Sequence, residues 1–156
     1  MADQPALLAP EVPTRDECAM ALLAHLLQVF TGFIAPLVIF CVKQDSRFVR
    51  FHALQSLIWQ LCYMAIFFGA MILFFVSMFT TIVHSGTAGH HQPPPPGFFI
   101  FFPLAWLLGM GGWVANLVLG IVYGIKANRG EWAAYPVIGP WLLRKYRPGA
   151  APQPMS

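Results

Sequence analysis

Residues 53–83 read ALQSLIWQLCYMAIFFGAMILFFVSMFTTIV and contain no Asp, Glu, Lys or Arg. They lie within an uncharged stretch of 75 residues that runs from Phe51 to Ile125. An α-helix needs about 20 apolar residues to cross the hydrocarbon core of a bilayer, so this stretch has room for more than one span. Only 10% of the 156 residues are charged, against about 25% in soluble domains. The composition therefore indicates an integral membrane protein and excludes an ordinary water-soluble globule.

Three segments are long and apolar enough to cross a membrane. We predict an all-α fold with three transmembrane helices over about residues 19–42, 53–83 and 98–125. The first helix should begin at Thr14, because Thr14-Arg15-Asp16-Glu17 fits the S/T-x-x-E capping box. It should be kinked by Gly32 and Pro36. Residues 48–55 are amphipathic and predict an interfacial helix start before the second span.

The remaining segments surround one predicted helical domain over residues 14–143. Residues 1–13 predict a flexible tail, and residues 144–156 predict a basic, proline-rich, disordered tail. The loop over 84–97 contains three histidines and four consecutive prolines, for which we expect a spacer and no metal site. Residues 132–143 are too short to cross, and their aromatic residues predict an interfacial anchor.

The nine Lys and Arg residues are distributed unevenly. With three spans, the first loop and the C-terminal segment share one side, which then holds every one of them except Arg15. The positive-inside rule predicts a multi-pass protein of the cell (plasma) membrane with its N-terminus out and its C-terminus in. The basic inner face should attract anionic lipid, and we expect no nucleic-acid partner.

Neutral polar and small residues recur at helical spacing within the spans. One set comprises His25 and Gln28 on the first helix, His52 and Gln55 on the second, and Asn116, Gly120 and Gly124 on the third. Small residues let helices approach closely, and amides bond across the seam. Two interpretations remain open, a packing interface with satisfied polar groups or a polar path for a substrate or protons. We expect His25 to be structural and to bond with Asn116 or Gln28.

No catalytic constellation is present. The sequence contains no GxSxG, no HExxH, no phosphate-binding glycine loop and no paired carboxylates within the spans. Four of the six acidic residues precede residue 18. We therefore predict no enzymatic activity, no catalytic or metal site and no cofactor.

Three motifs carry a family resemblance. They are AMALLAHL with His25, FVRFHALQ over 48–55 with Arg50, His52 and Gln55, and KANRGE over 126–131 with Asn128, Arg129 and Gly130. Together they resemble the Tic-twenty-like family, which comprises a chloroplast inner-envelope import component and bacterial relatives of unknown function. The resemblance implies a small, multi-spanning helical protein. Independently of it, Asn128-Arg129-Gly130 predicts a helix stop with Gly130 in the left-handed conformation.

Two functional hypotheses follow. The first is a non-enzymatic bacterial membrane protein that acts as an assembly or translocation-associated subunit, either as a homo-oligomer or with another membrane protein. The alternative is a small channel or transporter for a neutral or weakly charged solute.

Overall fold

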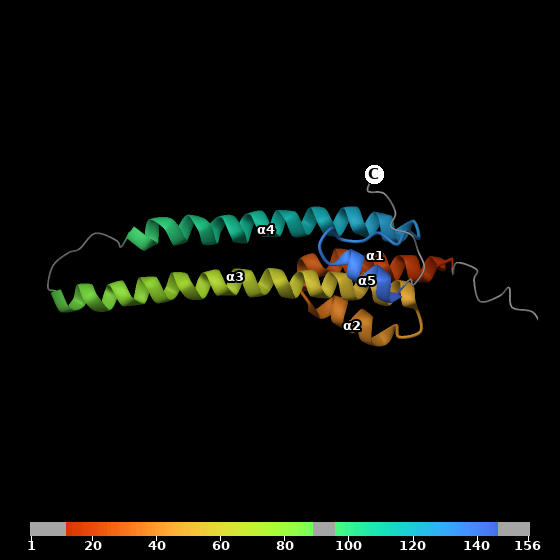
Figure 1. The fold of residues 1–156 in the computed structure, drawn as a ribbon, viewed down its shortest axis with the longest axis horizontal. Coiled ribbons are helices and arrows are strands. Elements are labelled where there is room, and N and C mark those ends of the chain that lie inside the picture. Colours follow the sequence, from red (N-terminus) through yellow and green to blue (C-terminus); the bar gives the residue numbers. More distant parts are fainter. Residues whose placement is uncertain (1–11, 89–95, 147–156) are drawn as a thin grey trace, which may run out of the picture.

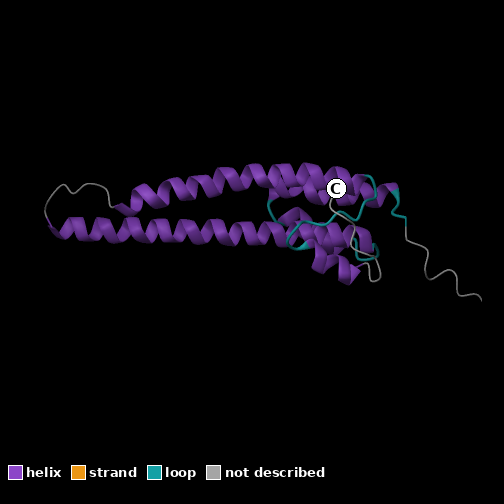
Figure 2. Ribbon diagram, turned by 45° about the horizontal axis from the view of Figure 1, so that its top comes forward, coloured by secondary structure: helices purple, strands orange, loops and turns teal. Residues whose placement is uncertain are grey.

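A computed structural model describes residues 12–88 and 96–146, and within them every regular element is an α-helix. The helices are α1 (Arg15–Thr31), α2 (Ile34–Val42), α3 (Arg47–Ala88), α4 (Pro96–Asn128) and α5 (Gly139–Tyr146). The two longest, α3 and α4, form an antiparallel pair, and α1, α2 and α5 gather at one end of it (Figures 1 and 2). The predicted all-α fold is confirmed for this part of the chain.

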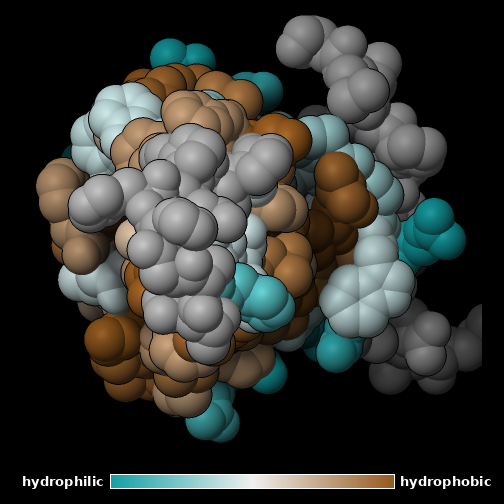
Figure 3. All heavy atoms as spheres, turned by 90° about the vertical axis from the view of Figure 1, so that its left-hand side faces the viewer, coloured by the Kyte–Doolittle hydropathy of each residue, from teal (hydrophilic) through white to brown (hydrophobic). Residues whose placement is uncertain are grey.

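The helices α3 and α4 match the predicted second and third spans. Their apolar stretches cover Arg47–His84 and Gly97–Asn128, and only 6% of the most apolar window of each is buried. An apolar helix of a soluble protein would instead be mostly buried in a core. Seen along the long axis from the left-hand side of Figure 1, the atoms that are not grey include many of strongly hydrophobic residues, with paler and a few hydrophilic ones between them (Figure 3). These two helices are therefore suited to cross a membrane.

The predicted single span over 19–42 is wrong. The chain breaks after Thr31, and α2 packs back against α1 and α3. Because α2 runs toward the end at which α1 began, the two helices form a hairpin (Figure 1). At 1.5 Å per residue, the 17 residues of α1 and the 9 of α2 are about 25 and 14 Å long. Neither reaches across a hydrocarbon core of about 30 Å.

Three residues explain why the break is a full turn rather than a kink. Gly32 has φ 64° and ψ −130°, a combination that is open almost only to glycine. The Thr31 hydroxyl donates to the carbonyl of Leu27 and accepts from the amide of Ala35, at 2.8 and 3.3 Å. Pro36 lies in the first turn of α2, where its missing N–H leaves no helix bond unmade.

The start of α3 also differs in part from the prediction. Its amphipathic first turns do not stand alone, because Phe48, Val49 and Phe51 are buried among the other helices, and α3 continues without interruption to Ala88. The interfacial depth of this segment stays a prediction. The anchor predicted over 132–143 is likewise partly a core segment, because Tyr135 is buried. Arg144 and Lys145 belong to α5 and not to a disordered tail. The predicted tail over 1–13, the rest of the C-terminal tail and the histidine-proline loop fall largely on residues 1–11, 147–156 and 89–95, outside the described residues.

All eight Lys and Arg residues of the described segments lie at the end where α1, α2 and α5 gather, which we call the charged end. They flank the start of α1, the α2–α3 connection, the end of α4 and α5: Arg15, Lys43, Arg47, Arg50, Lys126, Arg129, Arg144 and Lys145. The chain therefore enters α1 and leaves α5 at the same end. The structure thus offers two candidate spans in the described residues, and the three predicted transmembrane helices, with the N-terminus and the C-terminus on opposite sides, are not confirmed.

Two predicted helix ends are confirmed at the charged end. The Thr14 hydroxyl accepts from the Glu17 amide at 3.3 Å, and the Glu17 carboxylate accepts from the Thr14 amide at 2.7 Å. At the end of α4, Gly130 has φ 77° and donates to the carbonyl of Ala127, while the Glu131 amide donates to that of Lys126. This pair of bonds is the Schellman motif, which needs the left-handed glycine.

Candidate functional site

The charged end encloses a group of polar side chains that we call the polar core. It consists of His25 and Gln28 from α1, His52, Gln55 and Ser56 from α3, and Tyr135 from the α4–α5 connection, each at most 1% exposed. Polar groups removed from water must bond with one another. The polar core does so across three segments that are far apart in sequence, except that the side-chain oxygen of Gln28 has no partner within the described residues.

Two histidines form the centre of the polar core. His25 Nε2 and His52 Nδ1 are 3.0 Å apart, and His52 Nε2 is 3.1 Å from the carbonyl oxygen of Glu131. A carbonyl only accepts, so His52 Nε2 must donate. With both rings neutral, His52 Nδ1 then accepts from His25 Nε2, and His25 Nδ1 is left as an acceptor. The backbone of the α4–α5 connection thus sets the tautomers of both rings.

Two hydroxyls meet that acceptor. The Ser56 and Tyr135 hydroxyl oxygens lie 2.8 and 3.0 Å from His25 Nδ1, and the Gln28 amide donates to the Tyr135 oxygen at 3.2 Å. Burial raises the pKa of Tyr135, so its phenol stays protonated at neutral pH and remains a donor. Tyr135 therefore fastens the α4–α5 connection to α1.

Gln55 holds the same connection to α3. Its amide nitrogen donates to the carbonyl of Ala133 at 3.2 Å, and its amide oxygen accepts from the Tyr135 backbone N–H at 2.9 Å. One side chain thus satisfies two backbone groups of a segment that has no regular structure of its own. The Tyr135 bond is buried, so leaving that N–H unpaired would cost about 1–3 kcal/mol.

The sequence identified most members of the polar core but not their partners. His25 was expected to bond with Asn116 or Gln28, whereas it meets His52, Ser56 and Tyr135. The three-span topology had placed His25 and His52 near opposite faces of the membrane, and the hairpin brings them together. Tyr135 was noted in the sequence only as part of the Tyr135-Pro136 pair that follows the KANRGE motif and as an interfacial aromatic residue, and neither observation indicated its hydrogen bonds.

The glycines of α4 lie at its contact with α1. A Cβ at Gly120 would come 2.8 Å from the backbone oxygen of His25, and one at Gly124 would come 2.9 Å from Leu22. Only residues without a side chain allow so close an approach. Asn116, one turn before Gly120, donates to Gln60 of α3 at 2.9 Å. These contacts support the packing interpretation of the polar and small residues.

Side-chain hydrogen bonds between α3 and α4 become sparse beyond Asn116 and Gln60. Beyond that pair, the Tyr63 hydroxyl of α3 donates to the carbonyl of Gly109 in α4 at 3.1 Å. Farther along, phenylalanine rings of both helices pack together, as Phe74 does in tilted contact with Phe98 and Phe102. The polar core is therefore a closed cluster at the charged end, and it does not continue as a path along the helix pair.

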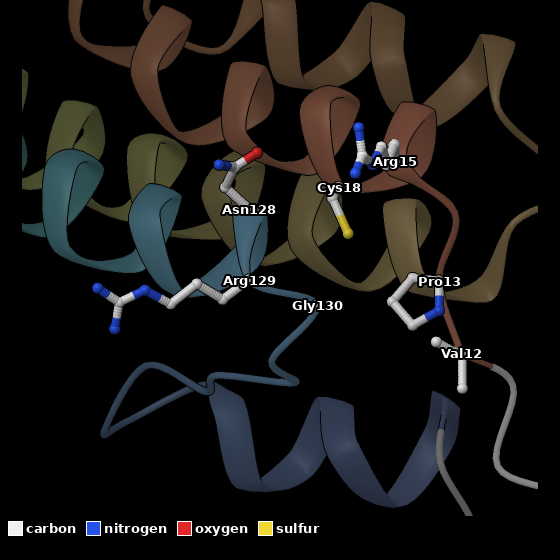
Figure 4. A pocket seen from close by; sticks show the side chains of 7 residues that line it. All are labelled: Val12, Pro13, Arg15, Cys18, Asn128, Arg129 and Gly130. Carbon is white, nitrogen blue, oxygen red and sulfur yellow. The ribbon is translucent and has the colours of Figure 1, made fainter.

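The other predicted positions surround the polar core without joining it. The Arg50 guanidinium lies 5.0 Å from the ring centre of Phe40 in α2 and 5.9 Å from that of Tyr146 in α5, which favours cation–π contact with both. Asn128, Arg129 and Gly130 line a shallow cavity of about 390 Å³, with Val12, Pro13, Arg15 and Cys18 (Figure 4).

This cavity offers no reactive group. The Arg129 side chain points away from its centre, and the Cys18 thiol points toward it (Figure 4). Burial raises the pKa of Cys18, which disfavours the thiolate that a nucleophile or metal ligand requires. Within the described segments no group of three or more His, Cys, Asp or Glu residues could hold a metal ion.

Comparison with known families decides the assignment. The model of the family described as "Magnetosome magnetite crystal formation protein family" (MamF_MmsF) matches residues 16–142, which is most of the chain. The chain belongs to this magnetosome family. The matched range begins at the first turn of α1 and ends within α5, so it contains the hairpin and the whole polar core.

The resemblance to the Tic-twenty-like family is thereby corrected. The motifs that carried it, FVRFHALQ and KANRGE, fall inside the range matched by the magnetosome family. No curated protein and no solved structure matches the chain. The import-related role that the resemblance implied has no support.

Proposed function

We propose that the protein is a two-span membrane protein with its charged end in the cytoplasm. In this arrangement α3 and α4 cross the bilayer, and the α1–α2 hairpin enters and leaves on one side. The positive-inside rule supports this orientation, because all eight basic residues of the described segments lie at the charged end. The described ends of the chain, Val12 and Tyr146, are then both cytoplasmic.

We further propose that it acts in the magnetosome membrane as a non-enzymatic assembly subunit in magnetite crystal formation. The observation that carries this proposal is the concentration of charge at one end of an uncharged helix pair, in a chain of the magnetosome family. The side chains of the polar core bond with one another or with the backbone and are inaccessible. The groups that remain for partners are the basic residues and the apolar faces of α3 and α4.

These groups define the partners. The basic residues suit anionic lipid headgroups, each contributing about 1 kcal/mol near the surface. The exposed apolar side chains of α3 and α4 suit acyl chains, a second copy of this chain or another membrane protein. In this proposal the chain acts by binding lipid and protein partners in the membrane, and it does not convert a substrate.

The proposal is tested in a magnetosome-forming bacterium from which its own members of this family have been removed. Crystal size and shape are measured by electron microscopy, and the protein is followed in purified magnetosome membranes. We expect the chain in those membranes and a shift of the crystals toward the wild-type distribution. A variant that separates α1 from α4, Gly120→Leu, should fail to restore them, whereas Gly69→Ala, whose new Cβ meets nothing within 4 Å, should succeed. Absence from magnetosome membranes, or crystals unchanged by the wild-type chain, would overturn the proposal.

A further inference from the structure

We propose that the α1–α2 hairpin is immersed in the cytoplasmic leaflet, where acyl chains cover α2, and that it makes the protein a wedge that prefers membrane convex toward the charged end. This inference rests on the two-span arrangement proposed above. It adds a lipid-facing surface and a preferred membrane curvature.

The outward face of α2 is apolar and uncovered. Ile34, Val38 and Val42 are 57%, 53% and 69% exposed, and their spacing of four residues puts them on one side of the helix. The opposite side of α2 packs on α1 and α3. No charged residue occurs between Glu17 and Lys43. Such a surface is costly in water and needs no further partner in hydrocarbon.

The depth of the hairpin equals one leaflet. Its tip lies level with the Gln60–Asn116 pair, because a Cβ at Gly32 would be 3.8 Å from Gln60 Nε2. Lys126, the charged residue of α4, follows Asn116 by ten residues, which is a distance of about 15 Å along the helix. Half of a hydrocarbon core of about 30 Å is also about 15 Å. The charged residues at the base of the hairpin therefore lie at the headgroups when its tip reaches the midplane.

The two ends of the molecule differ in cross-section. At the charged end α1, α2 and α5 lie beside α3 and α4, whereas at the opposite end of the described residues only α3 and α4 continue (Figures 1 and 2). Of the three added helices, α1 and α2 are the two that the hairpin inserts into the leaflet. Each helix is about 10 Å wide with its side chains. The cytoplasmic leaflet must therefore accommodate twice as many helices as the opposite leaflet. A leaflet on the convex side of a bent bilayer has more area at its headgroups, so it accepts this excess at lower cost.

The position of α2 is tested first. In full-length protein with Cys18, Cys41 and Cys62 replaced by alanine, a spin label is placed at Val38→Cys and its collisions with oxygen and with a water-soluble nickel chelate are measured in liposomes. We expect oxygen to reach the label and nickel not to. The matched control is Val12→Cys, which is 85% exposed just before α1 and should meet nickel readily.

The curvature preference is tested with membrane tethers pulled from giant vesicles. A membrane-impermeant dye on a C-terminal tag labels only those copies whose charged end faces outward, and the protein signal is divided by that of a lipid dye. We expect this ratio to rise as the tether narrows. The triple variant Ile34→Ser, Val38→Ser, Val42→Ser should lose the enrichment, while the corresponding triple alanine variant, which stays apolar, should keep it.

Each failure has a distinct meaning. A Val38 label that nickel reaches would place α2 in water and overturn the inference. A label reached by neither reagent would show that protein, such as a second copy, covers α2, and would overturn it too. A tether ratio that is independent of tether radius would refute the wedge. None of these results moves the ends of the chain, so the two-span arrangement is judged separately by the side on which they lie.

Discussion

Replacing Gly32 by alanine should destabilise the protein although there is room for the new methyl group. The nearest atom to a Cβ at this position is 3.8 Å away, which is ordinary van der Waals contact. The cost is therefore that of the backbone, since φ 64° with ψ −130° is unfavourable for alanine by about 1–3 kcal/mol. For a protein of this size, that corresponds to a fall of about 2–12 °C in melting temperature.

The assay is thermal unfolding in detergent, followed by circular dichroism, with Gly69→Ala as the matched control. Gly69 lies within α3 and a Cβ there meets nothing within 4 Å, so alanine should be neutral or should stabilise by up to about 1 kcal/mol. The sign of the Gly32→Ala effect distinguishes the two topologies. If residues 19–42 formed one continuous helix, alanine at 32 would also stabilise, and a raised melting temperature would refute the hairpin.

Three other perturbations test the packing and the polar core. Gly120→Ala should lower the free energy of unfolding by about 1–3 kcal/mol through overpacking, because its Cβ meets a backbone oxygen at 2.8 Å. The assay is thermal unfolding, with Gly111→Ala as the control, because a Cβ at Gly111 meets only a leucine methyl at 4.0 Å. Equal losses of stability in the two variants would contradict the prediction. Tyr135→Phe should cost about 1–3 kcal/mol and reduce the loss of stability above about pH 10: the raised pKa of the folded state gives stability that is complete below the unfolded-state pKa and is lost as pH rises through the folded-state value. Tyr146→Phe, in α5 and outside the polar core, is its control, and an unchanged alkaline limb in Tyr135→Phe would count against the buried phenol. The Ser46 hydroxyl and the capping box lower the pKa of Glu17. The stability that the Glu17 carboxylate gives to the folded protein is therefore present above the unfolded-state pKa and is lost as pH falls through the folded-state value. Glu17→Gln should flatten the acid limb of a stability–pH curve, and a limb as steep as that of the wild type would exclude this role.

The sequence predicted those features that depend on local chemistry or composition. The capping box at Thr14, the left-handed Gly130 and the two long apolar helices α3 and α4 each follow from a few adjacent residues or from a long apolar run. The polar residues His25, His52 and Asn116 were identified because polar groups are rare in apolar helices. None of these inferences required knowledge of the tertiary contacts.

The hairpin was missed because composition does not distinguish a span from a re-entrant pair. Residues 19–42 are as apolar as a true span, and Gly32 and Pro36 are also common in kinked membrane helices. The turn depends on the backbone conformation of a single glycine, for which the sequence offers no periodic signal. Once the topology was wrong, His25 and His52 were assigned to opposite faces, and no pairing between them could be inferred.

The measurement that tests the central claim most directly is the side of the membrane on which the N-terminus lies. Epitope tags at the N-terminus, at the C-terminus and within the 84–97 loop are exposed to protease in spheroplasts and in inverted membrane vesicles. The two-span arrangement predicts that both terminal tags are cleaved only in inverted vesicles and that the loop tag is cleaved only in spheroplasts. Cleavage of the N-terminal tag in spheroplasts, with the C-terminal tag protected there, would contradict it and restore the three-span topology.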